Sequence, residues 1–405
     1  MKRMILSTRI YSERGVIAGG FSIENNRIGK IYHREFLPNL CGYEVIDFGT
    51  NRIIPGLIEL HIHGYLGWSA MTSDKRQIQG LSKALPTAGI TAYTPTNHYF
   101  DNVFQNNANI AEVMEEKRDG ARIIGIHMEG PFISHEKLGS VLTEEALPVS
   151  ISLMEKYITS SKNNIVTVTM APELEGAFEL INFLVEKGIN VCIGHTNASY
   201  EEAIKAIDLG AKISQKTANA MRTIHHRDVG VVGAIMLDDR IISEVNSDHA
   251  HVSKEFCEIL YKMKGCEKIC IVADEGVMSG MKKGVYNLPD RGVYHVGPDT
   301  LLHISDMTID GSIYSMFYGL YNWVEKSKVP MEKAIVMASL NPAKVLGIEH
   351  FKGSISKCKD ADFVVIDDNF KILTTYIEGD AAYTINDGIE YANMKMYDYL
   401  VREYE

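Results

Sequence analysis

Two histidines one residue apart, His61 and His63, are the first residues of this chain whose spacing suggests chemistry. They close the apolar run LIELHIHG. Residues i and i+2 of a strand point to the same side, so both imidazoles would face one way. Two neutral imidazoles on one side form half of a site for a divalent transition metal. The pair by itself is equally compatible with two histidines tolerated in a loop.

Other apolar runs also end in polar side chains. Glu129 ends ARIIGIHMEG, His195 ends INVCIGH, and either Asp274 or Glu275 ends KICIVADEG. Each residue alone would often be structural, but together with the histidine pair they form a set typical of Zn²⁺ or Fe²⁺ hydrolases. In such a site the metal would lower the pKa of a water and polarise a scissile carbonyl, while Asp274 would move the proton. The expected chemistry is metal-assisted hydrolysis, with an amide as the expected bond.

The elements that would position these residues are eight short apolar runs separated by segments of helical period. Fully buried parallel strands form continuous apolar runs of this kind, and eight of them alternating with helices predict a (β/α)₈ barrel over residues 55–344. Catalytic groups of such barrels lie at the C-terminal ends of the strands. The runs are LIELHIHG, GITAYTPT, ARIIGIHMEG, IVTVTMAPE, INVCIGHT, AKISQKT, RIISEVNSD and KICIVADEG.

The two flanks of the chain have a different texture. Residues 1–54 and 345–405 are rich in alternating and β-branched residues, with Gly and Asn at the turns. Two such flanks around one middle segment predict a small β-sandwich domain formed by both termini. The tail 391–405 has two possible roles, closing the sandwich or helping assembly.

Composition narrows the class of partner. The net charge of −11 argues against nucleic acid or an anionic membrane as a partner, although a phosphorylated small molecule needs only one or two local cations. The six cysteines are scattered, and Cys266 and Cys270 have no second pair nearby, so free thiols are expected. No apolar stretch approaches the ~18 residues of a membrane span and no signal peptide is evident, so a cytoplasmic location is expected.

Longer motifs carry a resemblance to a known family. PGLIELHIHG, GIHMEGPFIS, GHTNASYEEA, NAM followed by HHRDVGVVGA, and MASLNPAKVLGI make the chain resemble the N-acetylglucosamine-6-phosphate deacetylases of the amidohydrolase superfamily. The similarity covers nearly the whole chain in order. EGPF, GHTNA and the spaced NAM and HHR are specific to that branch, whereas HxH is shared by the whole superfamily.

The resemblance implies a barrel with a β-sandwich formed by both chain termini, and assembly into a homodimer. The reaction that it implies is release of acetate from an N-acetylated amino-sugar 6-phosphate. The resemblance also implies a metal site built from His61, His63 and Asp274, with Asp274 as the general acid/base. A second site would contain His195 and a histidine from the sixth strand, and Glu129 would join the two sites.

For the substrate, the resemblance implies four further residues. Asn219 and Ala220, the latter through its backbone N–H, would contact the sugar phosphate. Arg227 and His251 would do so as well, with some of these groups supplied by a neighbouring subunit. A guanidinium fork matches the oxygens of a phosphate. Without the resemblance, Arg227 is interpreted as a surface charge and His251 as an ordinary polar loop residue.

Three departures from the family pattern surround the site. Lys216 in QKTANAM replaces the sixth-strand histidine of THLFNAM, GSV at Gly139–Val141 replaces GAH, and ADEG replaces TDAM. A protonated lysine repels a divalent cation. We therefore expect one Zn, Fe or Mn ion per subunit, with the Lys216 ammonium near the second position, where it pairs with Glu129 or polarises the substrate. The alternatives are a Lys216 that points away and a carbamylated Lys216 that acts as a ligand.

Three functions follow from these observations. The leading one is deacetylation of N-acetylglucosamine 6-phosphate, with N-acetylgalactosamine 6-phosphate as the next candidate. A second is hydrolysis of another amino-sugar phosphate, because Val141 replaces a histidine that could contact the sugar. A third is a degenerate barrel that binds sugar phosphates without turnover. Retention of Asp274, the histidine pair and Arg227 argues against the third.

Overall fold

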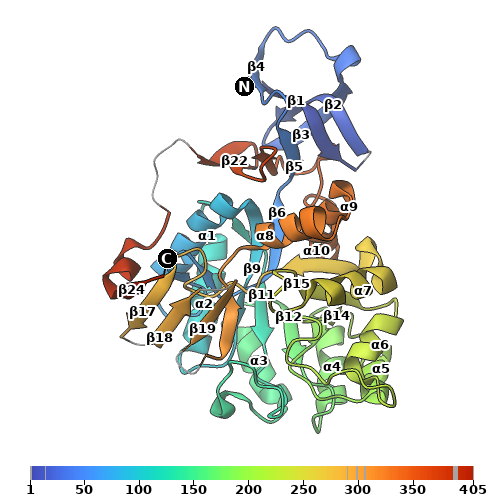
Figure 1. Ribbon diagram of the computed structural model, residues 1–405, viewed down its shortest axis with the longest axis vertical. Helices are drawn as coiled ribbons and strands as arrows, with labels where there is room; N and C mark the ends of the chain where they lie inside the picture. The colour runs from blue at the N-terminus through green and yellow to red at the C-terminus, as the bar shows by residue number, and fades with distance from the viewer. Residues whose placement is uncertain are drawn as a thin grey trace.

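A parallel sheet that winds into a nearly closed barrel forms the centre of the molecule (Figure 1). The computed structural model describes residues 2–13, 15–289, 291–297, 300–304, 307–385 and 391–404. A parallel bridge between Ile62 and Glu275 brings the last strand beside the first. The predicted (β/α)₈ fold is confirmed. The barrel strands are β6 (Leu57–Ile62), β9 (Ile90–Asn97), β10 (Arg122–Ile123), β11 (Ile126–Glu129), β12 (Ile165–Met170), β13 (Asn190–Ile193), β14 (Ile213–Ser214), β15 (Ile242–Asn246) and β16 (Ile269–Val272).

The barrel strands are apolar because helices cover their outer face while the barrel interior covers the other. Every residue of β9 is buried, for example. The surrounding helices are amphipathic, and several begin at a side chain that caps the free N–H groups of the first turn. Ser199 and Glu202 form a capping box at the start of α5, four residues after His195, and so fix where that strand-end loop enters its helix. The helices are α1 (Lys75–Ala84), α2 (Val103–Glu115), α3 (Ile151–Ser160), α4 (Ala177–Glu186), α5 (Tyr200–Asp208), α6 (Gly230–Leu237), α7 (Lys254–Lys264), α8 (Met316–Tyr321), α9 (Met331–Ile335) and α10 (Asn341–Val345).

Both ends of the chain build one β domain, which stands at the top of Figure 1. Antiparallel pairing of β5 with β21 joins the N-terminal to the C-terminal strands. Phe21, Phe363 and Tyr376 form its aromatic core, with ring centroids 5.3 Å apart for the first pair and 4.5 Å for the second. The predicted β domain formed by both termini is confirmed. Its strands are β1 (Lys2–Ser12), β2 (Gly15–Glu24), β3 (Arg27–His33), β4 (Tyr43–Asp47), β5 (Arg52–Pro55), β21 (Phe363–Ile366), β22 (Ile372–Ile377) and β23 (Asp380–Thr384).

A second sheet lies between β16 and α8, at the lower left of Figure 1, and no sequence pattern predicted it. Its strands are β17 (Gly284–Leu288), β18 (Gly292–Val296), β19 (Leu301–Ile304), β20 (Ile309–Ser312) and β24 (Leu400–Glu403). The tail strand β24 pairs with β17, so the described part of the tail completes this sheet rather than the β domain. We call β17–β20 with β24 the inserted sheet. A short hairpin, β7 (Gly64–Tyr65) and β8 (Trp68–Ser69), follows the HIH motif.

Two general features complete the fold. Within the described residues, no helix combines the length and the apolar character needed to cross a lipid bilayer. All six cysteines are free thiols; Cys270 is buried and Cys266 is partly buried.

Candidate active site

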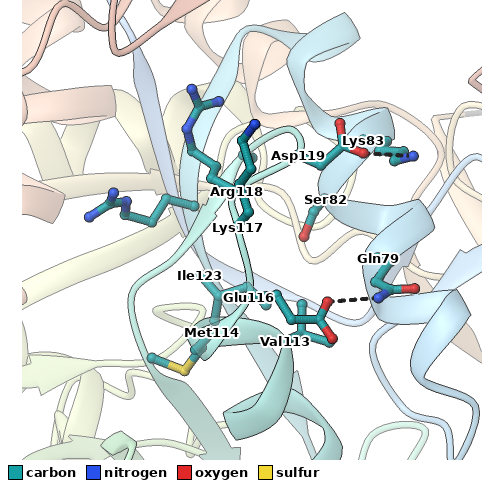
Figure 2. A pocket seen from close by; sticks show the side chains of 12 residues that line it. Gln79, Ser82, Lys83, Val113, Met114, Glu116, Lys117, Arg118, Asp119 and Ile123 are labelled. Atoms are coloured by element: carbon teal, nitrogen blue, oxygen red, sulfur yellow. Dashed lines mark hydrogen bonds and ion pairs between the residues drawn. The ribbon is translucent and has the colours of Figure 1, made fainter. Parts of the chain in front are cut away.

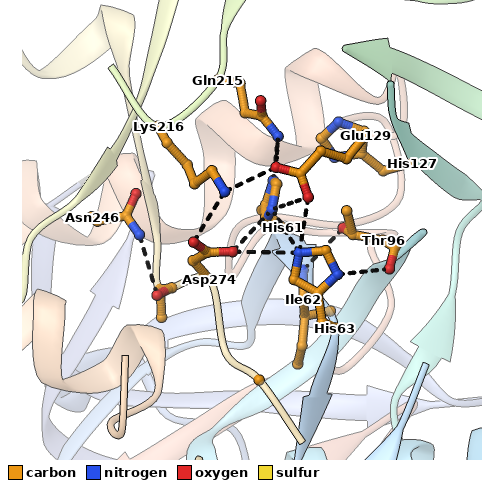
Figure 3. A network of polar contacts seen from close by, with 12 residues as sticks. His61, Ile62, His63, Thr96, His127, Glu129, Gln215, Lys216, Asn246 and Asp274 are labelled. Carbon is orange, nitrogen blue, oxygen red and sulfur yellow. Dashed lines mark hydrogen bonds and ion pairs between the residues drawn. The ribbon is translucent and has the colours of Figure 1, made fainter. Parts of the chain in front are cut away.

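Six of the residues singled out by the sequence lie together at the C-terminal ends of the barrel strands. Figure 3 shows five of them, His61, His63, Glu129, Lys216 and Asp274, pointing toward one another from the ends of β6, β11, β14 and β16. Their carboxylates, imidazoles and ammonium group form one contact network, and all but His63 are buried. We call this set the strand-end cluster: His61, His63, Glu129, His195, Lys216 and Asp274.

Three members of the cluster could hold one metal ion. The Nε2 atoms of His61 and His63 are 3.2 Å apart, and Asp274 Oδ1 lies 3.1 Å from the first and 3.5 Å from the second. Two imidazole nitrogens and one carboxylate oxygen are a common ligand set of catalytic zinc. His63 Nδ1 lies 3.0 Å from the carbonyl oxygen of Thr96, to which it can donate, so His63 Nε2 is free to bind a metal. The donor set therefore fits a divalent cation.

Glu129 lies between the histidine pair and the other side of the cluster. Its Oε2 is 3.0 Å from His63 Nε2, and its Oε1 is 2.9 Å from His195 Nε2. The Gln215 side chain donates to the same Oε1 at 2.7 Å. Burial alone would raise the pKa of Glu129, but the charges of Lys216 and His61 hold that pKa well below its usual range. Glu129 is therefore a carboxylate that several donors share.

Lys216 faces the cluster and does not point away from it. Its Nζ lies 2.9 Å from Glu129 Oε1 and 3.1 Å from Asp274 Oδ2. Burial opposes a charge on Lys216, but the two carboxylates outweigh it and raise the pKa of Lys216 above its ordinary value. The ammonium group thus bridges the two acidic residues of the site.

Three members of the cluster have an unusual backbone. His195, Lys216 and Asp274 have φ angles of 46°, 39° and 59°, and each lies two residues beyond the end of β13, β14 or β16. Positive φ is uncommon for residues other than glycine, and such residues concentrate at functional sites, where the surrounding structure maintains them. At all three strand ends the turn directs the side chain back toward the barrel axis.

Of the two acidic residues that end the eighth run, Asp274 is the one in the cluster. Glu275 instead accepts a hydrogen bond from the backbone N–H of Met316 at 3.2 Å. Burial raises the pKa of Glu275 to about 8. Beneath the cluster, Glu59 accepts from the backbone N–H groups of His61 and Ala273 at 2.9 and 3.2 Å. Glu59 thereby connects the strands that carry His61 and Asp274.

A cleft of about 450 Å³ opens in front of the cluster. Part of its wall was not predicted, because it comes from the inserted sheet and from the residues after β9. One signal was present in the sequence: residues 273–315 separate β16 from α8, far more than the usual two to six residues of such a connection. The unpredicted lining residues include His98, Phe100, Arg291, Tyr294 and Asp310.

The four residues expected to contact a phosphate lie outside the lining of this cleft. Asn219 and Ala220 follow β14, where the backbone N–H of Asn219 donates to the Lys216 carbonyl at 2.7 Å. Arg227 is exposed on the loop before α6. His251 Nδ1 lies 2.6 Å from the Asp248 carboxylate. Within the described residues, the Asn219 side-chain nitrogen is buried without a hydrogen-bond partner.

A second groove of about 530 Å³ lies at the opposite end of the barrel strands, between α1 and the start of β10 (Figure 2). Several of its polar and charged side chains are paired with other protein groups. Lys83 pairs with Asp119 at 2.7 Å, and Gln79 donates to Glu116 at 2.8 Å. The strand-end cleft, by contrast, is lined by the imidazole and carboxylate groups of the strand-end cluster.

Comparisons with known proteins agree with this assignment. The model of the amidohydrolase family matches residues 52–382. The chain is 31% identical over 391 residues to an N-acetylglucosamine-6-phosphate deacetylase of Bacillus subtilis (strain 168), covering 94% of this chain and 97% of the relative. It is 28% identical to an N-acetylgalactosamine-6-phosphate deacetylase of Escherichia coli O157:H7, covering 84% and 89%. The crystal structure of N-acetylglucosamine-6-phosphate deacetylase from Pasteurella multocida superposes with a TM-score of 0.86 at 27% identity, covering 94% and 99%.

Proposed function

The chain belongs to the amidohydrolase family, and we propose that it removes the N-acetyl group of N-acetylglucosamine 6-phosphate to give glucosamine 6-phosphate and acetate. The observation that supports this proposal most directly is the grouping of His61, His63 and Asp274 at the mouth of the barrel. Their possible ligand atoms all lie within 4.8 Å of one another. The named deacetylases that this chain resembles over most of its length support the choice of substrate.

His61, His63 and Asp274 would hold one divalent ion, with Zn, Fe and Mn all compatible with two imidazoles and a carboxylate. When bound, the ion lowers the pKa of a water toward ~7 and polarises the amide carbonyl. Glu129, 3.0 Å from His63 Nε2, is a further oxygen donor on the same side. His195 Nδ1 can donate to the Lys137 carbonyl at 2.8 Å, which keeps its Nε2 directed at Glu129.

Asp274 moves the proton in the proposed reaction. It takes a proton from the attacking water and gives it to the amide nitrogen as the bond to the acetyl carbon breaks. The Lys216 ammonium holds Asp274 Oδ2 at 3.1 Å and so fixes the orientation of the carboxylate. Asn246 donates to the Ala273 carbonyl at 3.3 Å and steadies the strand end that carries Asp274.

Lys216 accounts for a single metal ion per subunit in this proposal. Its Nζ contacts both Glu129 and Asp274, so one positive charge already lies between the carboxylates where a second cation would otherwise bind. A divalent ion at that place would meet a like charge at short range. We expect metal-loaded wild-type protein to contain about one equivalent.

Metal analysis of the purified protein tests this stoichiometry. Lys216→His should raise the bound metal from about one to about two equivalents, since it supplies an imidazole beside His195. Lys212→His is the matched control, because Lys212 is exposed at the start of the same strand segment and should leave the metal content unchanged. Two equivalents in the wild-type protein would contradict the proposal.

The proposal also covers the residues that bind the phosphate of the substrate and the assembly of the chain into a homodimer. Asn219, Ala220, Arg227 and His251 would contact the sugar phosphate. Arg227 is exposed on its own subunit, so it is available to the cleft of a neighbouring subunit in a homodimer. Sedimentation in buffer with and without substrate would measure the assembly, and a monomer with full activity would contradict a shared site.

The free thiols of all six cysteines support a reducing, cytoplasmic location.

Acetate release is the direct test of the function. Wild-type protein with added Zn²⁺, Fe²⁺ or Mn²⁺ should release acetate from N-acetylglucosamine 6-phosphate. The relative of Escherichia coli O157:H7 makes N-acetylgalactosamine 6-phosphate the second candidate, so both epimers belong in the assay. Asp274→Asn should lower kcat about 10²- to 10⁴-fold. Tight binding of both compounds without acetate release would instead indicate a sugar-phosphate-binding protein.

A further inference from the structure

The inserted sheet brings an acidic side chain into the cleft that the proposed reaction does not use. Asp310 lies in β20 and lines the same cleft as His63, Glu129 and Asp274. A Cβ atom placed on Gly276, two residues beyond Asp274, would lie 3.7 Å from Asp310 Oδ2. The carboxylate therefore lies against the strand end that carries the proposed acid/base.

The wall that carries Asp310 is tied to the barrel. Arg291, in the turn between β17 and β18, donates through Nη2 to the Ser69 hydroxyl and to the Met71 carbonyl, both at 3.0 Å. Ser69 belongs to the β7–β8 hairpin that directly follows the HIH motif. These bonds hold the inserted sheet at a fixed distance from the histidine pair.

Asp310 also faces the loop after EGPF. Burial raises the pKa of Asp310 to about 6, although the charge of His63 and a hydrogen bond with the Ser140 side chain both favour its charged form. Ser140 belongs to the GSV segment, one of the departures from the family pattern. Its neighbour Val141 is buried and packs with Ile133 and Ala146, so Ser140 is the residue of the GSV segment whose polar side chain contacts Asp310.

The other polar groups of this wall have protein partners. His98 Nδ1 lies 3.0 Å from the Tyr99 carbonyl oxygen and 3.4 Å from Glu145. Apolar side chains fill the space between these polar groups: Met71, Phe100, Leu142, Val277 and Ile304. A carboxylate in such a cleft is an acceptor that favours a donor group of the substrate, and it repels a phosphate. Hydroxyl groups are the donors that a sugar ring supplies.

We propose that Asp310 is a specificity-determining residue whose carboxylate accepts a hydrogen bond from a ring hydroxyl of the amino sugar. This inference rests on the proposed deacetylase function. Ser140 and Arg291 act as positioning residues, because one contacts the carboxylate and the other anchors the sheet that carries it. In this proposal the phosphate end of the substrate points away from Asp310, since a carboxylate and a phosphate close together repel each other.

Deoxy substrates test the proposal directly. kcat/KM is measured for N-acetylglucosamine 6-phosphate and its 3-deoxy and 4-deoxy analogues, with wild type, Asp310→Asn and Asp310→Ala. The wild-type protein should use one of the two analogues about 10- to 150-fold less well than the parent, the range of a hydrogen bond to a charged group. In Asp310→Ala the ratio of kcat/KM for the parent compound to kcat/KM for that analogue should fall to near one. Bound metal and Tm should stay at wild-type values.

Two comparisons keep the outcome decisive. Asp239→Ala, which removes an exposed carboxylate outside the cleft, should retain the wild-type ratios. If Asp310→Ala does not fold, Asp310→Leu, which is similar in size and has no hydrogen-bond acceptor, decides by the same ratio. Unchanged ratios in a variant that still releases acetate would overturn the role of Asp310 alone. No acetate from the parent compound with wild-type protein would overturn the proposed function, and this inference with it.

Discussion

Single residues set the charge balance of the strand-end cluster. Glu129 and Asp274 are two buried carboxylates, and Lys216 contacts both of them. Burial opposes a charge on His63, but hydrogen bonds and charges from Asp274 and Glu129 raise the pKa of His63 to about 10. His63 is therefore protonated in the metal-free protein. Its positive charge and that of Lys216 together balance the charges of the two carboxylates. Metal binding must displace that proton.

The stability of the metal-free protein should accordingly fall with rising pH. The pKa of His63 is near 6.5 in the unfolded chain and about 10 in the fold, so its stabilising contribution is complete below pH 6.5 and is lost as pH rises toward 10. Thermal unfolding of metal-free protein at pH 6, 8 and 10 should show a falling Tm. His63→Gln should flatten this dependence.

Metal affinity should change in the opposite direction over the same pH window, because the ion and the proton compete for His63 Nε2. Titration calorimetry in two buffers of different ionisation enthalpy would count the proton released. A Tm difference between wild type and His63→Gln that stays constant from pH 6 to 10 would contradict this account.

At the scale of elements, strand ends position the site and the inserted sheet closes it. β6, β11, β13, β14 and β16 each deliver one or two members of the cluster within two residues of the strand end. The opposite wall depends on β18 and β20, which are held by antiparallel pairing along the inserted sheet. β24, from the tail, covers the free edge of β17.

Removing residues 400–405 should therefore weaken substrate binding more than metal binding. The truncation deletes β24 and uncovers Tyr286, Leu288 and their neighbours in the core of the inserted sheet. We expect KM for the sugar phosphate to rise several-fold, because the wall with Tyr294 and Asp310 becomes less ordered. The metal content should stay unchanged, since its proposed ligands belong to the barrel. Equal losses of metal and of substrate affinity would contradict this division.

The elements also show what the sequence could predict. Continuous apolar runs predicted all eight barrel strands, because a strand buried on both faces must be apolar throughout. The third run is interrupted at Ile124 and Gly125 and forms β10 and β11, a break that an apolar pattern does not reveal. The inserted sheet escaped prediction since its strands are short and separated by polar turns, which resemble a long loop.

The candidate site, like the fold, was predictable in part. His61, His63, Glu129, His195 and Asp274 stand at the ends of recognisable runs, so strand order alone brings them together. The contact of Lys216 with Glu129 was among the expectations, but its second contact, with Asp274, was not, because it depends on a positive φ at Lys216 and on the position of another strand end. Asp310 was not predictable either. Its place in the cleft depends on contacts between the inserted sheet and the barrel, which lie far apart in the sequence.

At the scale of the whole molecule, one lysine stabilises the junction between the β domain and the barrel. Lys352 follows the last barrel helix and is almost fully buried, with 2% of its surface exposed. Its Nζ lies 2.5 Å from Asp362 and 3.0 Å from Asp360. Asp362 also accepts from the backbone N–H of Glu378 at 2.8 Å, and its carbonyl accepts from Gly56 at 3.0 Å. The N-terminal strand, the C-terminal strands and the barrel thus meet at this group.

Lys352→Met should destabilise the whole chain. It leaves the Asp362 carboxylate buried without its cation and leaves Asp360 with the Arg27 guanidinium at 3.9 Å. Breaking a buried ion pair in this way costs about 3–5 kcal/mol of unfolding free energy. Lys357→Met is the matched control, because Lys357 is exposed on the same segment and should change stability by no more than about 0.5 kcal/mol. Urea unfolding followed by the fluorescence of the buried Trp323 and of Trp68, which packs against the same hydrophobic core, measures both variants.

Adding Asp362→Asn to Lys352→Met should restore part of the lost unfolding free energy, since one unpaired charge is then removed. An unchanged urea midpoint for Lys352→Met would show that the junction does not depend on this ion pair.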